Sequence, residues 1–229
     1  MLDAMADSSS SDRSAAFRRH PIRYVGDTEA AAASIVSHLD STSGNFDLLS
    51  QTSDPTHITA ADIVAVSMLA LPVPPPSAAW ILGAEGQWLT SEILADIPEH
   101  IDLWNCDAGG ILRAADLFQL LRASTSSFPP SQGEAAVGQA TATRILAAKR
   151  PRLVPIDDRE IRDALRYPKN SLWFRRWQDT LDDELLSSAR AARNLAADER
   201  PEAINLSELR VIDIVVRRRA KKRRNAARS

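Results

Sequence analysis

The sequence predicts an all-α fold, organised as a single compact multi-helix domain. Apolar residues recur at three- and four-residue spacing in several segments, and no segment alternates apolar and polar residues as a half-buried strand would. Helix-capping signatures precede two of the apolar runs. A chain of 229 residues with 44% hydrophobic residues is long enough to bury a sizeable core.

The N-terminal half is expected to hold helices joined by short polar segments. Asp27 or Thr28 can cap the first helix, and Thr59 opens a Thr-x-x-Asp capping box before a largely apolar run. The Ile and Val content of that run also permits a strand, but its cap and its length favour a buried helix. Residues 41–54 are predicted to be a loop and residues 102–110 a turn. Helices are predicted at residues 30–39, 59–71, 77–82, 87–97 and 111–121.

The C-terminal half carries further apolar patterns at helical spacing. Ser171 is predicted to cap a helix whose apolar side chains are Phe174, Trp177, Leu181 and Leu185. Residues 189–197 either continue that helix or form a second one. Asn205 and Glu208 make an Asn-x-x-Glu cap for the last helix. Its buried face is predicted to consist of Leu209, Ile212, Val215 and Val216.

Composition and the N-terminus exclude several classes of protein. Residues 1–16 are polar and rich in serine, which predicts a disordered leader before a helical domain at 17–216. They lack the apolar core of a signal peptide, and no apolar run approaches the roughly 20 residues of a membrane span. Cys106 is the only cysteine, and the histidines are scattered without ligand spacing, so neither a metal nor a cofactor is expected. These features predict a cytoplasmic protein and leave its oligomeric state open.

Residues 217–229 form a basic tail. Positions 217–228 carry eight positive charges and no acid, so the formal net charge of −2 leaves −10 for the remainder of the chain. Flexible basic tails bind polyanions without sequence preference, which favours nucleic acid as a partner over a tail that only improves solubility. The cations expected to contact phosphates are Arg217, Arg218, Arg219, Lys221, Lys222, Arg223 and Arg224.

Residues 111–166 are predicted to form a helix-hairpin-helix-like centre, with the hairpin in segment 134–163. In such a module the turn exposes backbone N–H groups, and the positive end of the second helix faces a phosphate. Gly138, preceded by Val137, lets the backbone approach a ligand without an intervening side chain. Thr141 opens the following helix. An ordinary helix start at a glycine is an equally good interpretation, because one glycine is a weak motif.

The stretch VGQATATRILAAKRPRLVPIDDREIRD resembles the central segment of the helix-hairpin-helix DNA glycosylases of base-excision repair. In those enzymes Thr-Ala opens the helix after the hairpin, and a Val-Asp step follows whose aspartate is catalytic. Val137-Gly138 and Thr141-Ala142 match the hairpin and the helix start, and Asp158 falls at the catalytic position. The resemblance therefore implies that Asp158 would stabilise positive charge on the sugar as the C–N bond breaks.

The chain departs from the glycosylase pattern at several positions. Ala136 replaces the first hairpin glycine, and Glu134-Ala135 replaces the preceding Leu-Pro, which places an acid near the expected phosphate. Ala140 stands where the lyase-type members have a catalytic lysine, so a Schiff-base mechanism is not supported. If the chain is an enzyme, the resemblance implies an N-glycosylase without lyase activity.

Simpler structural interpretations accompany the candidate site residues. Asp is a favoured N-cap residue, so Asp158 capping a helix at 159–166 is preferred over a catalytic role. Trp173 or Trp177 can form the wall of a pocket for a flipped base, but tryptophan at helical spacing usually packs in a core. The cations of the basic cluster can contact phosphates or offset a helix dipole, and the two roles are compatible; they are Lys149, Arg150 and Arg152.

Four stretches, TAADIVAVSMLAL, IDLWNCD, TATRILAAKRPRLVPIDD and LRVIDIVV, together resemble an uncharacterised family of actinobacterial proteins, a domain of unknown function. That family often has glycine at the position of Ala136 and an aromatic residue at the position of Asp157. No activity is established for the family, so this resemblance implies no reaction.

Three hypotheses on function follow. The favoured one is a helical protein that binds nucleic acid, chiefly the DNA backbone, without sequence preference. The second is a monofunctional DNA N-glycosylase that uses Asp158. The third is a helical protein-interaction module whose hairpin is purely structural. The first and third are not enzymes.

Overall fold

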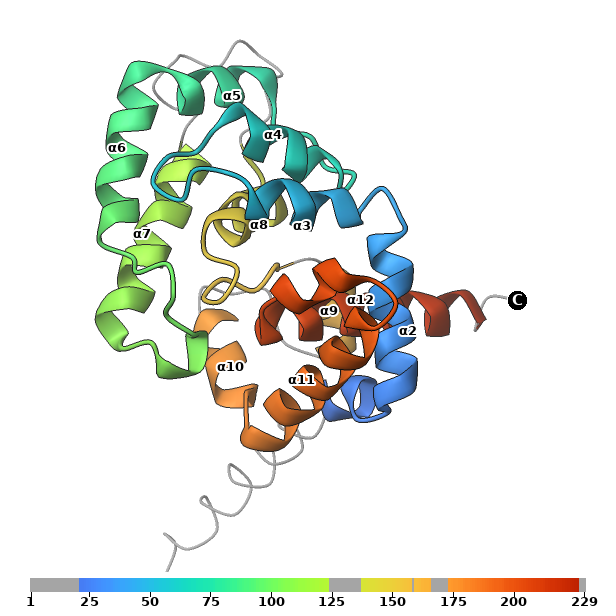
Figure 1. Ribbon diagram of the computed structural model, residues 1–229. Coiled ribbons are helices and arrows are strands. Elements are labelled where there is room, and N and C mark those ends of the chain that lie inside the picture. The colour runs from blue at the N-terminus through green and yellow to red at the C-terminus, as the bar shows by residue number, and fades with distance from the viewer. Residues whose placement is uncertain (1–20, 124–136, 158, 166–172, 227–229) are drawn as a thin grey trace, which may run out of the picture.

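The computed structural model describes residues 21–123, 137–157, 159–165 and 173–226, and every regular element in these ranges is a helix (Figure 1). The predicted all-α class is confirmed. The leader expected at 1–16 lies outside the described residues. The elements are α2 Thr28–Leu39, α3 Gly44–Gln51, α4 Ala60–Ser67, α5 Pro75–Leu82, α6 Ala84–Ala95, η1 Leu103–Asn105, α7 Ala108–Ala123, α8 Gln139–Lys149, α9 Arg159–Leu165, α10 Trp173–Thr180, α11 Asp183–Ala197, η2 Pro201–Asn205 and α12 Glu208–Ala226.

The helices surround two central ones. Helix α8 packs against α3, α4 and α7, while α12 packs against α2, α9 and α11 (Figure 1). The buried apolar side chains around both helices belong to one contiguous cluster. Every residue of Thr141–Lys149 in α8 and of Glu208–Val216 in α12 is buried. The stripe expected on α12 is therefore buried as predicted, but so is the opposite side of the helix, including its charged residues.

Local capping signals were good guides to helix starts. Asp27 is the N-cap of α2, and its side chain accepts a hydrogen bond from Ala30 N at 3.1 Å. Thr59 and Asp62 form the predicted capping box of α4. The last helix differs, because Asn205 lies inside η2 and Ser207 Oγ accepts from Arg210 N at 3.1 Å. The prediction that Asn205 caps the last helix is wrong. Asn205 ends a short 3₁₀ helix that the sequence pattern does not predict, and the cap is Ser207.

Two further predictions are corrected by tertiary contacts. The loop expected at 41–54 contains α3, which is held by the buried Phe46 and by ion pairs of the buried Asp47. The helix expected to run from Phe174 to Leu185 ends at Thr180, and Asp182 begins α11 by accepting from Leu185 N at 2.9 Å. Leu181 thus lies in a break between helices.

A buried charge network joins α2, α3 and α12. Asp47 accepts from Arg210 Nε at 2.6 Å and from Arg210 Nη2 at 3.0 Å, and its Oδ2 lies 2.7 Å from His38 Nε2. Asp213 pairs with Arg210 and accepts from Arg217 Nη2 at 2.9 Å. Charged groups are rarely buried this fully unless they are paired, and here each charge lies against another.

This network shifts the protonation of two of its members. Burial alone would raise the pKa of Asp47, but the charge of Arg210 and the hydrogen bonds from His38 and Arg210 lower it to about 2. Burial lowers the pKa of His38; the hydrogen bond with Asp47 opposes this, while the charge of Arg210 adds to it. The ring is therefore neutral in the fold, and because its acceptor is a carboxylate, Nε2 carries the proton.

The neutral His38 predicts a pH dependence of stability. A histidine whose pKa falls below its ordinary 6.5 on folding binds its proton only in the unfolded chain, so the free energy of unfolding decreases as pH drops below 6.5. The slope can reach about 1.4 kcal/mol per pH unit for one proton. The contribution of Asp47 to the free energy of unfolding is lost only at lower pH, toward its pKa of about 2. The pH ranges in which His38 and Asp47 affect stability are therefore distinct.

Urea unfolding of wild type and His38→Gln between about pH 7.5 and about pH 5.5 tests this. Glutamine keeps a donor toward Asp47 but cannot titrate. The free energy of unfolding should therefore decrease less steeply with falling pH in the variant. His57→Gln replaces an exposed histidine and serves as the control. Its free energy of unfolding should depend on pH as steeply as that of the wild type. Equal slopes in wild type and His38→Gln would show that folding does not lower the pKa of His38.

Candidate functional site

The predicted hairpin residues lie at the start of α8. Val137 and Thr141 are buried, whereas Gly138 is exposed and is the N-cap residue. Gly138 has φ −69° and ψ 159°, and a Cβ placed there would meet no atom within 4 Å. Neither backbone conformation nor space therefore requires glycine at this position. The remaining reason for a glycine would be close approach of a ligand to the backbone.

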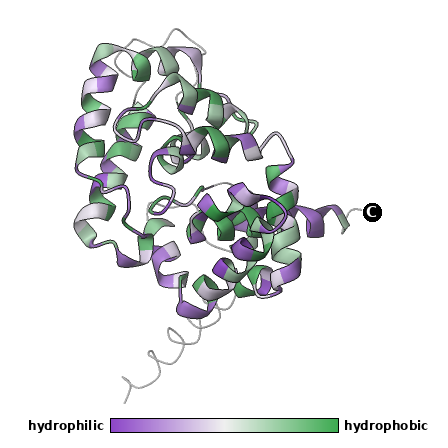
Figure 2. Cartoon of the chain, viewed as in Figure 1, coloured by the Kyte–Doolittle hydropathy of each residue, from purple (hydrophilic) through white to green (hydrophobic). Residues whose placement is uncertain are grey.

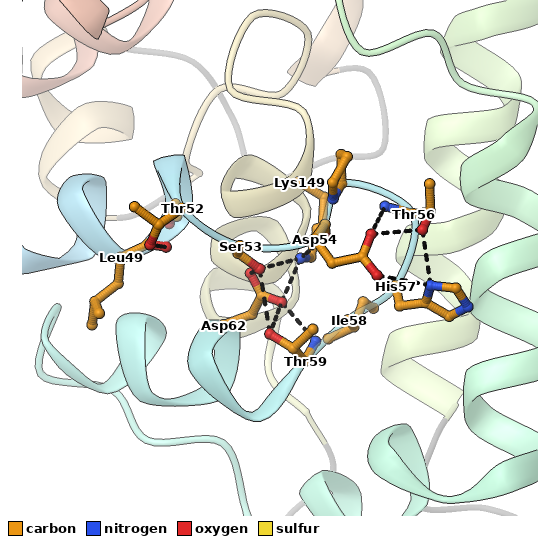
Figure 3. Close-up of polar contacts among 12 residues, drawn as sticks. Leu49, Thr52, Ser53, Asp54, Thr56, His57, Ile58, Thr59, Asp62 and Lys149 are labelled. Carbon is orange, nitrogen blue, oxygen red and sulfur yellow. Dashed lines mark hydrogen bonds and ion pairs between the residues drawn. The ribbon is translucent and has the colours of Figure 1, made fainter.

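Lys149, predicted to contact phosphate, is buried inside the protein. Its Nζ lies 2.5 Å from Asp62 Oδ2 and donates to Ser53 Oγ and to Asp54 O, both at 2.6 Å (Figure 3). Three donors thus meet three acceptors, which leaves none for an external anion. Burial lowers the pKa of Lys149, and the hydrogen bond and charge of Asp62 offset this only in part. The ammonium ties the end of α8 to the segment between α3 and α4.

Arg150 is buried as well and makes no contact with a carboxylate among the described residues. Its guanidinium donates to the carbonyls of Leu94 and Ile97 at 2.7 Å each and to that of Pro55 at 2.9 Å. Leu94 lies in the last turn of α6, so Arg150 adds a charged donor at the C-terminal end of a neighbouring helix.

Arg152 differs from its two neighbours because its side chain is 40% exposed, with Nη2 donating to Asp102 Oδ2 at 2.8 Å. It lines a cleft of about 500 Å³ between the two groups of helices. The cleft is bounded by parts of residues 46–55, 99–100, 147–152 and 204–210, together with Arg193. Its buried lining includes Asp47, Lys149 and Arg210. Sequence patterns gave no sign of this cleft, because its walls come from five separate segments.

The predicted basic tail is helical as far as Ala226, since α12 continues without a break. Its arginines are anchored to the body: Arg219 Nη1 donates to Tyr24 O at 2.5 Å, Arg223 lies 4.8 Å from the centre of the Tyr24 ring, and Arg224 pairs with Glu160 at 3.2 Å. Arg217 pairs with Asp213, and Arg218 donates to Ser37 Oγ. Among residues 217–226, the exposed cations are Lys221, Lys222 and Arg223.

Asp158, the predicted catalytic residue, lies outside the described residues, as does the side chain of Trp173. The preceding Asp157 is buried and accepts from Gln139 Nε2, and its Oδ2 forms an ion pair with Arg162 Nη1 at 3.0 Å. Trp177 is 1% exposed and belongs to the apolar core. In this arrangement Trp177 is a packing residue, as the simpler interpretation predicted.

In the part of the chain that the structure describes, no three His, Cys, Asp or Glu side chains lie close enough together to hold a metal ion. None of the described helices combines the length and the apolar character needed to cross a bilayer.

The fold and the cleft define an all-helical protein built on two buried, charge-bearing helices. The chain belongs to the family of unknown function DUF6308, whose family model matches residues 23–220. The match runs from the segment before α2 into the basic part of α12. No curated protein and no solved structure matches the chain.

If Lys149 is structural, removing its charge should destabilise the protein. Lys149→Met leaves Asp62 buried without its cation, and breaking a buried pair costs about 3–5 kcal/mol. We expect about 3 kcal/mol, since Asp62 keeps hydrogen bonds from Thr59 and Ser53. The measurement is the free energy of unfolding in urea.

The matched control is Lys221→Met, which makes the same chemical change at an exposed position. It should change the free energy of unfolding by no more than about 0.5 kcal/mol. Similar values for the two variants would mean that Lys149 is not held in its buried contacts.

Proposed function

We propose that the exposed end of α12 binds the phosphate backbone of nucleic acid without sequence preference. The observation that carries the proposal is the position of Lys221, Lys222 and Arg223 on the exposed part of an anchored helix, in a segment without any acid. This end of α12 projects past α2 and is strongly hydrophilic (Figures 1 and 2). A rigid support reduces the entropy lost when cations bind a phosphate chain.

The placement of these cations favours backbone contact over reading of bases. Successive helical residues are about 100° apart, so Lys221, Lys222 and Arg223 together span about 200° of the helix circumference. Such a spread offers contacts to phosphates in several orientations and presents no single face to a groove. The formal charge of −10 outside residues 217–228 repels polyanions elsewhere, which directs them to this end.

The proposal keeps only part of the residue set expected from the sequence. Lys149 and Arg150 are left out because their donors are occupied inside the protein. Gly138 contributes at most a backbone amide. No described contact supports base excision, so the glycosylase hypothesis is not carried further.

The proposal predicts salt-dependent binding to both DNA and RNA. Full-length protein should bind fluorescently labelled duplexes of unrelated sequence with similar affinity at low salt. In the triple variant Lys221→Gln, Lys222→Gln and Arg223→Gln, affinity should fall, and the slope of log K against log salt on DNA should decrease by about 2–3. Fluorescence anisotropy across a salt series measures both quantities.

A matched control removes three exposed charges elsewhere, by Arg113→Gln, Arg122→Gln and Arg175→Gln. This variant has the same net charge as the first and should keep most of the affinity and the slope. No binding by the full-length protein at low salt would refute the proposal. Equal losses in the two triple variants would show that net charge, and not the α12 end, governs binding. Binding to anionic vesicles but not to either nucleic acid would also refute it.

A further inference from the structure

The cleft beside α8 has the dimensions of a small-molecule site. Its volume of about 500 Å³ falls within the range of roughly 300–1,000 Å³ that ligand pockets occupy. Its buried charges are already paired: Lys149 with Asp62, and Arg210 with Asp47 and Asp213. Those groups make a rigid floor that does not need a ligand for its own stability.

Two arginines of the cleft retain unused donors. Among the described residues, Arg152 Nε and Arg193 Nε are buried and have no hydrogen-bond acceptor. Asp102 Oδ1 and Glu208 Oε2, oxygens of their ion-pair partners, are likewise buried without a donor, so each ion pair leaves hydrogen-bonding capacity on both of its members. Both arginine side chains line the cleft and keep partial exposure, 40% for Arg152 and 19% for Arg193.

Each guanidinium is held by the protein through some of its donors. Arg152 donates to Asp102 Oδ2 at 2.8 Å. Arg193 Nη1 donates to Leu206 O at 3.0 Å and lies 3.6 Å from Glu208 Oε1. Contacts that fix a guanidinium while leaving other N–H groups free are the arrangement that binds oxyanions, because the planar fork matches two oxygens of a phosphate.

The rest of the lining indicates what the anion would be attached to. Gln51 and Asn205 line the cleft with exposed amide side chains. Amides of this kind form hydrogen bonds with sugar-like hydroxyl groups. Ile204, which is 50% exposed, supplies an apolar surface at the edge.

We infer that this cleft binds a small phosphate monoester with a hydroxylated scaffold, of the size of a sugar phosphate or a mononucleotide, with Arg152 and Arg193 as its phosphate ligands. This site is separate from the basic end of α12 and does not require nucleic-acid binding.

Isothermal titration of the full-length protein with ribose 5-phosphate, AMP and inorganic phosphate tests the inference. Saturable binding of ribose 5-phosphate or AMP is expected, and it should be tighter than that of inorganic phosphate. Ribose and citrate distinguish the contributing groups. Binding of ribose as tight as that of ribose 5-phosphate, or binding of citrate as tight as that of the phosphate esters, would overturn the assignment of a phosphate monoester.

Variants then locate the site. Arg152→Gln and Arg193→Gln should each weaken binding about tenfold or more, whereas Arg113→Gln, at an exposed arginine on α7, should leave it unchanged. Arg152→Lys and Arg193→Lys keep the charge and the solubility but lose the fork, so they should also weaken binding. They replace the glutamine variants if those fail to fold.

Two results would contradict the inference directly. One is the absence of saturable binding of every phosphate compound at millimolar concentration. The other is unchanged affinity in folded Arg152 and Arg193 variants. The Lys221→Gln, Lys222→Gln and Arg223→Gln variant should retain the binding, so failure of this inference is distinguishable from failure of the nucleic-acid proposal.

Discussion

The contact between Arg210 of α12 and Asp47 of α3 is the interaction on which much of the architecture depends. The N-terminal half of α12 is surrounded by other helices, so a cation at position 210 is tolerated only with paired acids around it. One of these acids is Asp47, which precedes Arg210 by 163 positions in the chain. His38 of α2 contacts the same carboxylate. This requirement explains why a short, mostly polar segment such as 44–51 forms a helix and lies in the core.

The same constraint governs α8. Lys149 and Arg150 end a helix that is buried along its length, and their donors meet oxygens of the 53–62 region and of the C-terminal end of α6. The two cations thus act as ties between elements, while the neighbouring Arg152 extends to the surface. One short basic cluster in the sequence therefore divides into two structural residues and one that lines the cleft.

These pairings also determine where positive charge remains available. Buried cations are satisfied by acids, as for Lys149 and Arg210, or by backbone carbonyls, as for Arg150. Among the described residues, cationic groups remain accessible at the anchored end of α12 and at the edge of the cleft, as well as at isolated surface arginines. The first suits an extended polyanion, because it is convex and projects from the body (Figure 1). The second suits a small anion, because it is concave and its arginines are held by Asp102 and by the Leu206 carbonyl.

Most of the helices and several of their starts follow from local sequence. Capping by Asp27 and by the Thr59–Asp62 pair, and the apolar stripe of α12, are encoded within a few residues of one another, and such local signals can be recognised without knowing the fold. Contacts between distant segments account for the helix α3, for the capping of α12 by Ser207 in place of Asn205, and for the inward orientation of Lys149 and Arg150. Such contacts also form the cleft where five segments meet. The physical reason is that the free energy of a buried charge depends on its partner, and the partners of Lys149 and Arg210 are brought near only when the chain folds.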